Sequence, residues 1–327
     1  MQRRQVTIGL LLAAPALLAT RGAAKADDFP SRPVMIIVPY GAGGGVSINA
    51  RALAPYLEKT LGTRVLVENR EGAGGITGHT AGAMAKPDGY PLTMVSPAIC
   101  ASPWLVPNVR FTPESFAYVG QVSFVPNMLV VSADSKFQTL KDLVDAMRAA
   151  PDTISTGMEA GWPSSSVADL VFLSKAGVKA KVVPGFKGGA EKIAAVLGGH
   201  LDFSVNNTQE VMPLYEAKRI RILAMVAPER SPLFPDVPTF RELGYDVTMG
   251  VWRTLAAPKD TPQPVLDKLA AALKAALQLP ELKDDFAKVQ LTVDYLDPAA
   301  ARARAMAEYD AYGKLFTTMG INVKTKS

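Results

Sequence analysis

Two glycine-rich segments are the stretches of this sequence best suited to hold a ligand. Residues 40–47 read Tyr-Gly-Ala-Gly-Gly-Gly-Val-Ser and follow a continuous apolar run at residues 34–38. Residues 69–78 repeat the arrangement between a second predicted strand and helix. Glycine lets the backbone approach a ligand closely, and the start of a helix offers unpaired N–H groups with partial positive charge. The two loops therefore predict a site for a carboxylate or a phosphate that is built from backbone atoms.

A nucleotide is one alternative ligand for the first loop. The dinucleotide pattern Gly-x-Gly-x-x-Gly, started at Gly41, fails because Val46 stands where its last glycine belongs. The phosphate-loop pattern fails as well, since no Gly-Lys-Ser/Thr follows. Glu68, about 20 residues further on, does imitate the acid that binds a ribose in dinucleotide folds. A nucleotide-binding module and a purely structural glycine turn both stay open at this point.

Catalytic and metal-binding patterns are weak. Neither His79 nor His200 has the spacing of a metal ligand, and the serines of residues 161–166 do not form a Gly-x-Ser-x-Gly elbow. Cys100, the single cysteine, lies in an apolar stretch that predicts a small buried residue. We therefore expect no catalytic residue, no metal and no cofactor. A secreted enzyme of the hydrolase type that uses the same cleft is kept as the alternative.

The positive charge of the chain is concentrated at its start. The sequence has 35 Lys and Arg against 30 Asp and Glu, a formal net charge of +5. Residues 1–26 contain four cations, an apolar run and a small-x-small site that ends at Ala26, which is typical of an export signal. Removing those four cations leaves +1 on the mature chain. We expect a periplasmic protein, cleaved after Ala26, without nucleic acid as a partner and without direct membrane insertion.

Strand and helix patterns alternate along the mature chain, which predicts an α/β fold with parallel strands. Strands are expected at 34–38, 64–68, 92–95, 127–131, 180–183, 201–205, 220–226 and 247–255, with a short extended piece at 153–155. Helices are expected at 47–61, 76–84, 140–149, 167–175, 191–197, 265–277 and 298–316.

The order of these elements predicts two domains. Residues 27–126 and 250–327 would form a discontinuous first domain, and residues 127–249 the second, inserted through two extended crossings. A ligand would then bind in the cleft between the domains, near the carboxyl ends of the strands.

Several short motifs in sequence resemble one known family. Residues 37–40 (Ile-Val-Pro-Tyr), the triple glycine 43–45 and Ala50-Arg51 are similar to the first loop of the periplasmic substrate-binding proteins of tripartite tricarboxylate transporters, the Bug-type family. Residues 67–75 resemble its second loop. The match continues in order through residues 87–90, 187–189, 197–202, 230–239, Trp252 and 257–258.

The resemblance implies a two-domain periplasmic-binding-protein architecture, of the Venus-flytrap, type II-like kind. It implies a receptor, expected to be a monomer, that captures a small carboxylate and delivers it to the membrane subunits of a tripartite transporter. A sensor that serves a two-component kinase is an alternative. The carboxylate would be held mainly by backbone groups and ordered water. The residues carried over are Tyr40, Gly41, Gly45, Ser47, Gly75, Ile76, Ser164, Ser165, Phe186, Lys187, Asn206, Asn207, Trp252 and Arg253.

The sequence departs from the family pattern at charged positions. Val46-Ser47 replaces Thr-Asp, and Asn206 replaces an aspartate, so two carboxylates that could face the cleft are absent. We therefore expect the receptor not to favour a ligand ammonium group, because no anion would compensate it. Arg253 follows Trp252, where an aromatic or small residue is usual. It could bind a second ligand carboxylate or pair with an acid near the hinge.

Overall fold

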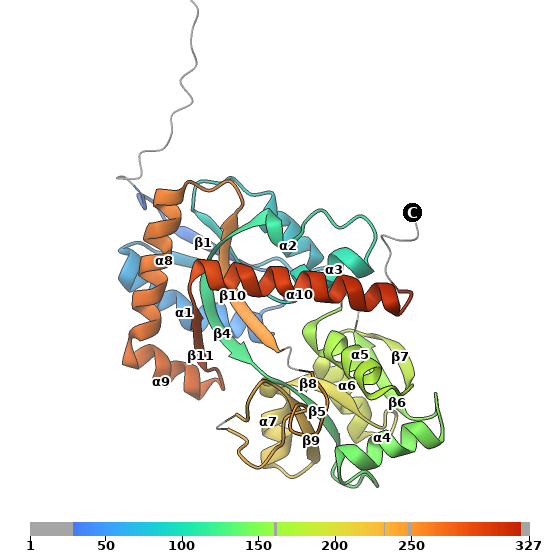
Figure 1. Cartoon of the computed structure of the whole chain (residues 1–327). Coiled ribbons are helices and arrows are strands. Elements are labelled where there is room, and N and C mark those ends of the chain that lie inside the picture. The colour runs from blue at the N-terminus through green and yellow to red at the C-terminus, as the bar shows by residue number, and fades with distance from the viewer. Residues whose placement is uncertain (1–28, 160–161, 232, 248–249, 322–327) are drawn as a thin grey trace, which may run out of the picture.

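The strands of the described residues form one six-stranded sheet and a second group of five (Figure 1), and one hydrophobic cluster contains residues of both groups. The computed structural model describes residues 29–159, 162–231, 233–247 and 250–321. The predicted export signal, residues 1–26, lies outside the described residues. Within the described part, no helix combines the length and apolar character needed to span a bilayer.

The six-stranded sheet has the order β11-β4-β10-β3-β1-β2. Its strands are β1 (Val34–Val38), β2 (Val65–Asn69), β3 (Pro91–Val95), β4 (Phe116–Val125), β10 (Val251–Pro258) and β11 (Val293–Leu296). β1 pairs in parallel with β2 and β3, as the strand–helix alternation predicts. β10 returns from the far end of the chain and pairs antiparallel with both β3 and β4.

Helices cover both faces of this sheet. They are α1 (Gly45–Leu61), α2 (Ile76–Ala83), α3 (Ala98–Leu105), α8 (Gln263–Gln278), α9 (Pro280–Lys288) and α10 (Pro298–Thr318), with short 3-10 turns at Ala73–Gly75 and Pro113–Ser115. Along β10, Leu255 belongs to the core shared with α1 and α8, whereas Trp252 and Ala256 belong to the core shared with α3 and α10. Alternate residues of a strand point to opposite faces, so Arg253 points to the α1 face.

The second group contains a three-stranded sheet and a two-stranded pair. The sheet, in the order β8-β5-β9, consists of β5 (Asn127–Ser132), β8 (Ser204–Asn207) and β9 (Ile220–Val226). The pair is β6 (Ser155–Glu159) with β7 (Lys181–Phe186), and a single bridge from Thr156 to Phe203 links it to the sheet. Around them lie α4 (Leu140–Ala149), α5 (Ser164–Ala176), α6 (Gly189–Leu197) and α7 (Thr208–Glu216).

Several elements differ from the sequence expectation. The sequence reading did not identify α3, β4, α7, α9 and β11, and the extended piece expected at 153–155 is instead the strand Ser155–Glu159. α3 and α7 contain Pro103 and Pro213, and proline is unfavourable inside a helix, so the sequence does not predict helices there. β4 leads into β5 with only Pro126 between them, so the two strand groups are closely coupled at this point.

Candidate functional site

A cavity of about 260 Å³ lies where the two strand groups meet. From the side of the six-stranded sheet it is lined by the β1–α1 loop, the β2–α2 loop at Gly74, the end of β3 and the start of β10. From the other side come the end of β6 and the starts of α5, α6 and α7. Its lining residues are Tyr40, Gly41, Gly44, Gly45, Val46, Gly74, Ser96, Pro97, Glu159, Pro163, Ser164, Lys187, Gly188, Gly189, Asn207, Glu210, Val251 and Arg253.

Three helices begin at this cavity without a side-chain cap. The residues before their first turns are Gly44 for α1, Pro163 for α5 and Gly188 for α6, and none of the three caps its helix with a side-chain hydrogen bond. Glycine and proline offer no side-chain oxygen that could accept from the first N–H groups. The N–H groups of Ser47 and Glu191 already bond the carbonyls of Gly44 and Gly188. The first two N–H groups of each helix and their partial positive charge therefore stay available to an anion.

Arg253 is the buried cation of the cavity. Its side chain is 1 % exposed, and its Nε and Nη1 donors have no hydrogen-bond partner. No carboxylate of the described residues lies within 4.0 Å of it. Burial lowers the pKa of Arg253 to about 10, which leaves it charged at neutral pH. Of the two roles considered for Arg253, pairing with an acid is thus not seen in the described part of the chain.

Gly45 makes room for this guanidinium. A Cβ atom at position 45 would stand 2.5 Å from Nη2 of Arg253, closer than any real contact. Glycine therefore allows this close approach, and a larger residue would make the guanidinium shift. The triple glycine thus has two effects. It leaves the first N–H groups of α1 without a side-chain cap, and it leaves room for the Arg253 side chain.

Tyr40 and Ser47 shape the first loop differently. The Tyr40 hydroxyl lies 3.0 Å from Oγ of Ser96, and burial raises the pKa of Tyr40 to about 12, so it is neutral. Ser47 is fully buried and does not line the cavity. Asn69 donates to both the Tyr40 carbonyl (2.7 Å) and the Ser47 hydroxyl (3.0 Å). Ser47 therefore stabilises the first loop through its hydrogen bond with Asn69 and does not face the cavity.

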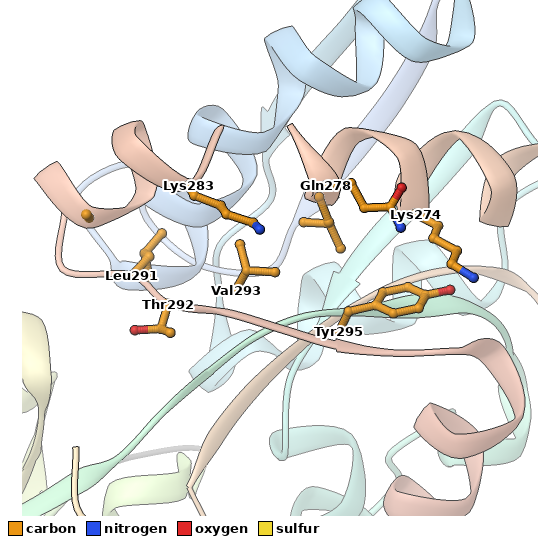
Figure 2. A pocket seen from close by; sticks show the side chains of 9 residues that line it. Lys274, Gln278, Lys283, Leu291, Thr292, Val293 and Tyr295 are labelled. Atoms are coloured by element: carbon orange, nitrogen blue, oxygen red, sulfur yellow. The ribbon is translucent and has the colours of Figure 1, made fainter. Parts of the chain in front are cut away.

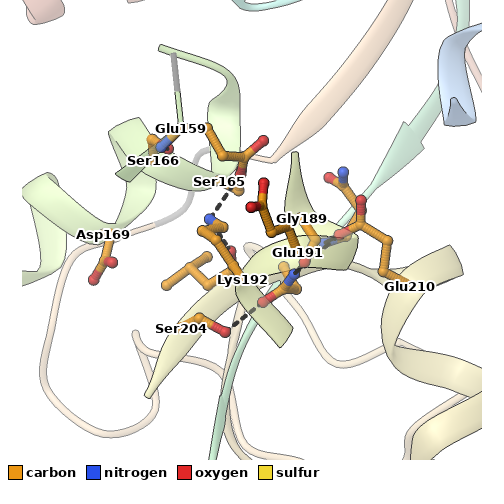
Figure 3. Close-up of polar contacts among 12 residues, drawn as sticks. Glu159, Ser165, Ser166, Asp169, Gly189, Glu191, Lys192, Ser204 and Glu210 are labelled. Carbon is orange, nitrogen blue, oxygen red and sulfur yellow. Dashed lines mark hydrogen bonds and ion pairs between the residues drawn. The ribbon is translucent and has the colours of Figure 1, made fainter. Parts of the chain in front are cut away.

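Two carboxylates on the opposite side complete the lining (Figure 3). Glu159 forms an ion pair of 2.7 Å with the buried Lys192 and accepts from the Ser165 hydroxyl at 2.8 Å. Glu210 accepts from the side chain of Asn206 (3.1 Å) and from the Asn207 amide (3.2 Å). Burial raises the pKa of Glu210. The premise that the cleft lacks carboxylates is therefore wrong, because the two acids come from positions that the family comparison did not consider.

The structure brings half of the predicted site residues to the cavity. They are Tyr40, Gly41, Gly45, Ser164, Lys187, Asn207 and Arg253. Ser47, Gly75, Ile76, Ser165, Phe186, Asn206 and Trp252 do not line it. Gly75 packs against the Tyr40 ring, and Trp252 points away and donates to Glu308 at 2.9 Å. Ser165 and Asn206 lie one contact behind the lining, since each bonds one of its carboxylates.

Sequence reasoning missed Glu159 and Glu210. A signal for Glu210 exists, because it stands three residues after Asn207 at a strand-to-helix junction, in the spacing of a helix-capping acid. Glu159 is the last residue of β6 and lies at the cavity, where the loops that follow the other strands also lie. No comparable motif marks it.

The histidines lie outside this cavity. His79 is buried between the rings of Tyr40 and Phe111, with centroids 5.9 and 5.4 Å away, and burial lowers its pKa to about 3. His200 is exposed beyond the end of α6. Among the described residues, no group of three or more His, Cys, Asp or Glu is placed to hold a metal ion.

A larger groove lies between α8, α9 and β11 (Figure 2). Its volume is about 580 Å³, and Lys274, Lys283 and Tyr295 are among its lining residues. Both lysines are exposed, and none of the residues predicted to bind a ligand lies there. Solvated cations hold an anion weakly, so the cavity between the strand groups is the better candidate site.

Comparison with known proteins agrees with this fold. Residues 49–319 match the family model of the tripartite tricarboxylate transporter family receptor. A protein of Agrobacterium vitis, described as a UPF0065 protein in the TAR-I ttuE-ttuC' intergenic region, is 34% identical over 299 residues, covering 90% of this chain and 86% of the relative. The structure of the periplasmic binding protein BugD is similar with a TM-score of 0.78 and 31% identity, over 90% of this chain and 99% of that one.

Two similar structures from Rhodopseudomonas palustris contain ligands. MatC with bound malate is 26% identical, with a TM-score of 0.77 over 88% of this chain and 99% of its own. A second protein with adipate is also 26% identical, with a TM-score of 0.79 over 90% and 99%. The family match covers most of the chain and consists of binding proteins, which are not enzymes, so the hydrolase alternative falls. With its α/β periplasmic-binding-protein fold, the chain belongs to the receptor family of the tripartite tricarboxylate transporters.

Proposed function

We propose that this receptor captures a small carboxylate in the cavity between its two strand groups. Residues 27–126 with 250–327 would form one domain and residues 127–249 the other, and they would close on the ligand as a monomer. The loaded receptor would deliver the ligand to the membrane subunits of a tripartite transporter. Residues 1–26 would direct the chain to the periplasm and be removed after Ala26.

Arg253 carries this proposal. A guanidinium that is 1 % exposed and has two unpaired donors needs an acceptor, because an unpaired buried charge is costly. A ligand carboxylate would accept from Nε or Nη1 and neutralise the charge.

The starts of α1, α5 and α6 would contribute backbone N–H groups, and ordered water could complete the shell. Malate in MatC and adipate in the second R. palustris protein support a carboxylate as the ligand class.

Calorimetric titration of the mature chain tests the carboxylate. The panel contains malate, adipate and monocarboxylates, each beside its uncharged amide, for example adipate beside adipamide. We expect at least one acid to bind with a Kd in the micromolar range or below, and its amide to bind at least about 100-fold more weakly. A panel in which no acid binds, while a sugar or a nucleotide does, would overturn the proposal.

A further inference from the structure

The two cavity carboxylates differ in how the protein neutralises them. Lys192 is fully buried, and its Nζ lies 2.7 Å from Oε1 of Glu159. The same oxygen accepts from the Ser165 hydroxyl at 2.8 Å. Lys192 also donates to the Val205 carbonyl at 2.8 Å, which fixes its position. Glu159 therefore has its counter-charge within the protein.

Glu210 has hydrogen bonds but no direct ion pair among the described residues, and Lys192 acts on it only from a distance. Asn206 and the amide of Asn207 both donate to Oε2, and neither is charged. No Lys, Arg or His of the described residues lies within 4.0 Å of the carboxylate. Oε1 accepts no hydrogen bond from the described part of the chain, so it is available to a ligand. Figure 3 shows Glu210 on the far side of Gly189 from the Glu159–Lys192 pair.

Gly189 leaves room for the Glu210 carboxylate. A Cβ atom at position 189 would overlap the carboxylate, so only glycine allows this contact. The hydrogen bonds and the close backbone contact together hold the carboxylate at the cavity wall. Gly45 likewise leaves room for the guanidinium of Arg253.

Arg253 and Glu210 line one cavity from opposite sides. They attract each other through the cavity, but the two side chains form no direct ion pair. Arg253 comes from β10 and Glu210 from α7. A plain carboxylate would neutralise the arginine and leave the glutamate buried without a cation, which is costly. A hydroxyl group would donate one hydrogen bond but bring no positive charge. A ligand with both a carboxylate and a protonated amine neutralises both groups at once.

We infer that Glu210 is the binding group for a ligand ammonium, and that the receptor selects an amino acid over the corresponding plain acid. This rests on the proposed function, because the ligand carboxylate still binds Arg253. It reverses the expectation from the sequence that an ammonium group would find no anion. Residues 46, 47 and 206, where the family pattern can have an acid, carry none in this chain. Glu210, in the first turn of α7, supplies one instead.

Matched pairs of ligands test the inference. The wild-type protein is titrated by calorimetry with alanine and propionate, leucine and 4-methylpentanoate, and glutamate and glutarate. We expect at least one amino acid to bind at least about tenfold more tightly than its partner without the amine, the usual strength of a charged hydrogen bond. In Glu210→Gln, this ratio falls to about one because the amino acid binds more weakly, while the affinity for the plain acid does not fall.

Two further variants keep the test valid if Glu210→Gln does not fold. Gly189→Ala displaces the Glu210 carboxylate without removing it, and it should also lower the ratio. Glu216→Gln makes the same chemical change at an exposed position of α7 and should keep the wild-type ratio. Thermal unfolding of each variant checks that it is folded.

The outcomes separate this inference from the proposed function. Plain acids that bind as tightly as their amino acids, or tighter, overturn the ammonium site and leave the carboxylate receptor standing. A preference for the amino acid that survives in folded Glu210→Gln also overturns it. If no acid of either kind binds, the proposed function itself fails.

Discussion

On the side of the six-stranded sheet, Arg253 is buried without an ion pair, whereas on the other side Glu159 and Lys192 are buried as a pair. The first arrangement leaves a charge that something else must neutralise. The second is complete in itself and links β6 to α6. The difference teaches that burial of charge alone does not mark a binding group. What marks it is a buried charge that the protein leaves without a partner, beside a cavity that a ligand can enter.

The largest effect is expected from breaking the complete pair. Lys192→Met leaves Glu159 buried without a cation, so the free energy of unfolding should fall by about 3–5 kcal/mol. Urea denaturation measures this. The double variant with Glu159→Gln should recover most of the loss.

The control is Lys141→Met, which breaks an exposed pair with Asp145 and should cost under about 0.5 kcal/mol. If Lys192→Met costs no more than this control, the pair is not a structural unit.

Arg253→Met should affect binding and not folding. The affinity for a carboxylate should fall by about 100-fold, close to 3 kcal/mol, because the ligand loses its buried charged donor. The free energy of unfolding without ligand should not fall, since no ion pair is lost.

Calorimetry and urea denaturation separate the two effects, with exposed Arg241→Met as the control. If Arg253→Met loses as much stability as Lys192→Met and keeps its affinity for the carboxylate, Arg253 is a structural residue. The two sides of the cavity would then not differ in the way described.

Glu308 belongs, like Arg253, to the part of the molecule that contains the six-stranded sheet, and its buried carboxylate makes stability depend on pH. Burial raises the pKa of Glu308 from its usual 4.5 to about 7, and Trp252 donates to it at 2.9 Å. The folded state therefore holds a proton that the unfolded state releases, and stability falls as pH rises from about 4.5 to about 7.

In Glu308→Gln this contribution disappears, so the variant should gain up to about 3 kcal/mol relative to the wild type across that window. Urea denaturation at several pH values measures the gain. A constant difference between the two proteins over this range would contradict the raised pKa.

Lys187→Met should have the smallest effect. Lys187 lines the cavity but is exposed, so its charge is hydrated and screened. We expect the affinity for a carboxylate to change less than about threefold, and the change to shrink further at 0.5 M salt. Titration at low and high salt measures this. A loss as large as that of Arg253→Met would mean that the exposed cation shares the main binding role.

Much of the fold could be predicted from the sequence because the core strands carry strong local signals. The apolar run of β1 and the strand–helix alternation after it predict the parallel pairing of β1 with β2 and β3. β4 was missed although it lies beside β10, because its buried run contains Gly120 and polar residues such as Gln121 and Ser123. These polar side chains find partners such as Asp294 and Asn49, which only the tertiary structure brings near.

The site could be predicted in part. The first glycine loop and Arg253 carry signals in their own sequence neighbourhood, and both reach the cavity. Trp252 and Ser47 do not line the cavity, because strand and helix geometry turns them away, which residue spacing near a loop does not resolve. Glu159 and Glu210 depend on how two distant segments meet, so no local pattern could pair them with Arg253.

The place of β10 in the six-stranded sheet has a consequence for the order in which the chain can fold. β10 lies between β3 and β4, yet more than a hundred residues separate it from both in the chain. Strands β5 to β9 are continuous in sequence, so their sheets can form as soon as residue 226 is available. The larger sheet must wait for residue 258, because its central strand arrives late and its pairing is strongly non-local. In such a chain β1 to β4, which end at residue 125 and are synthesised first, wait longest for their complete sheet.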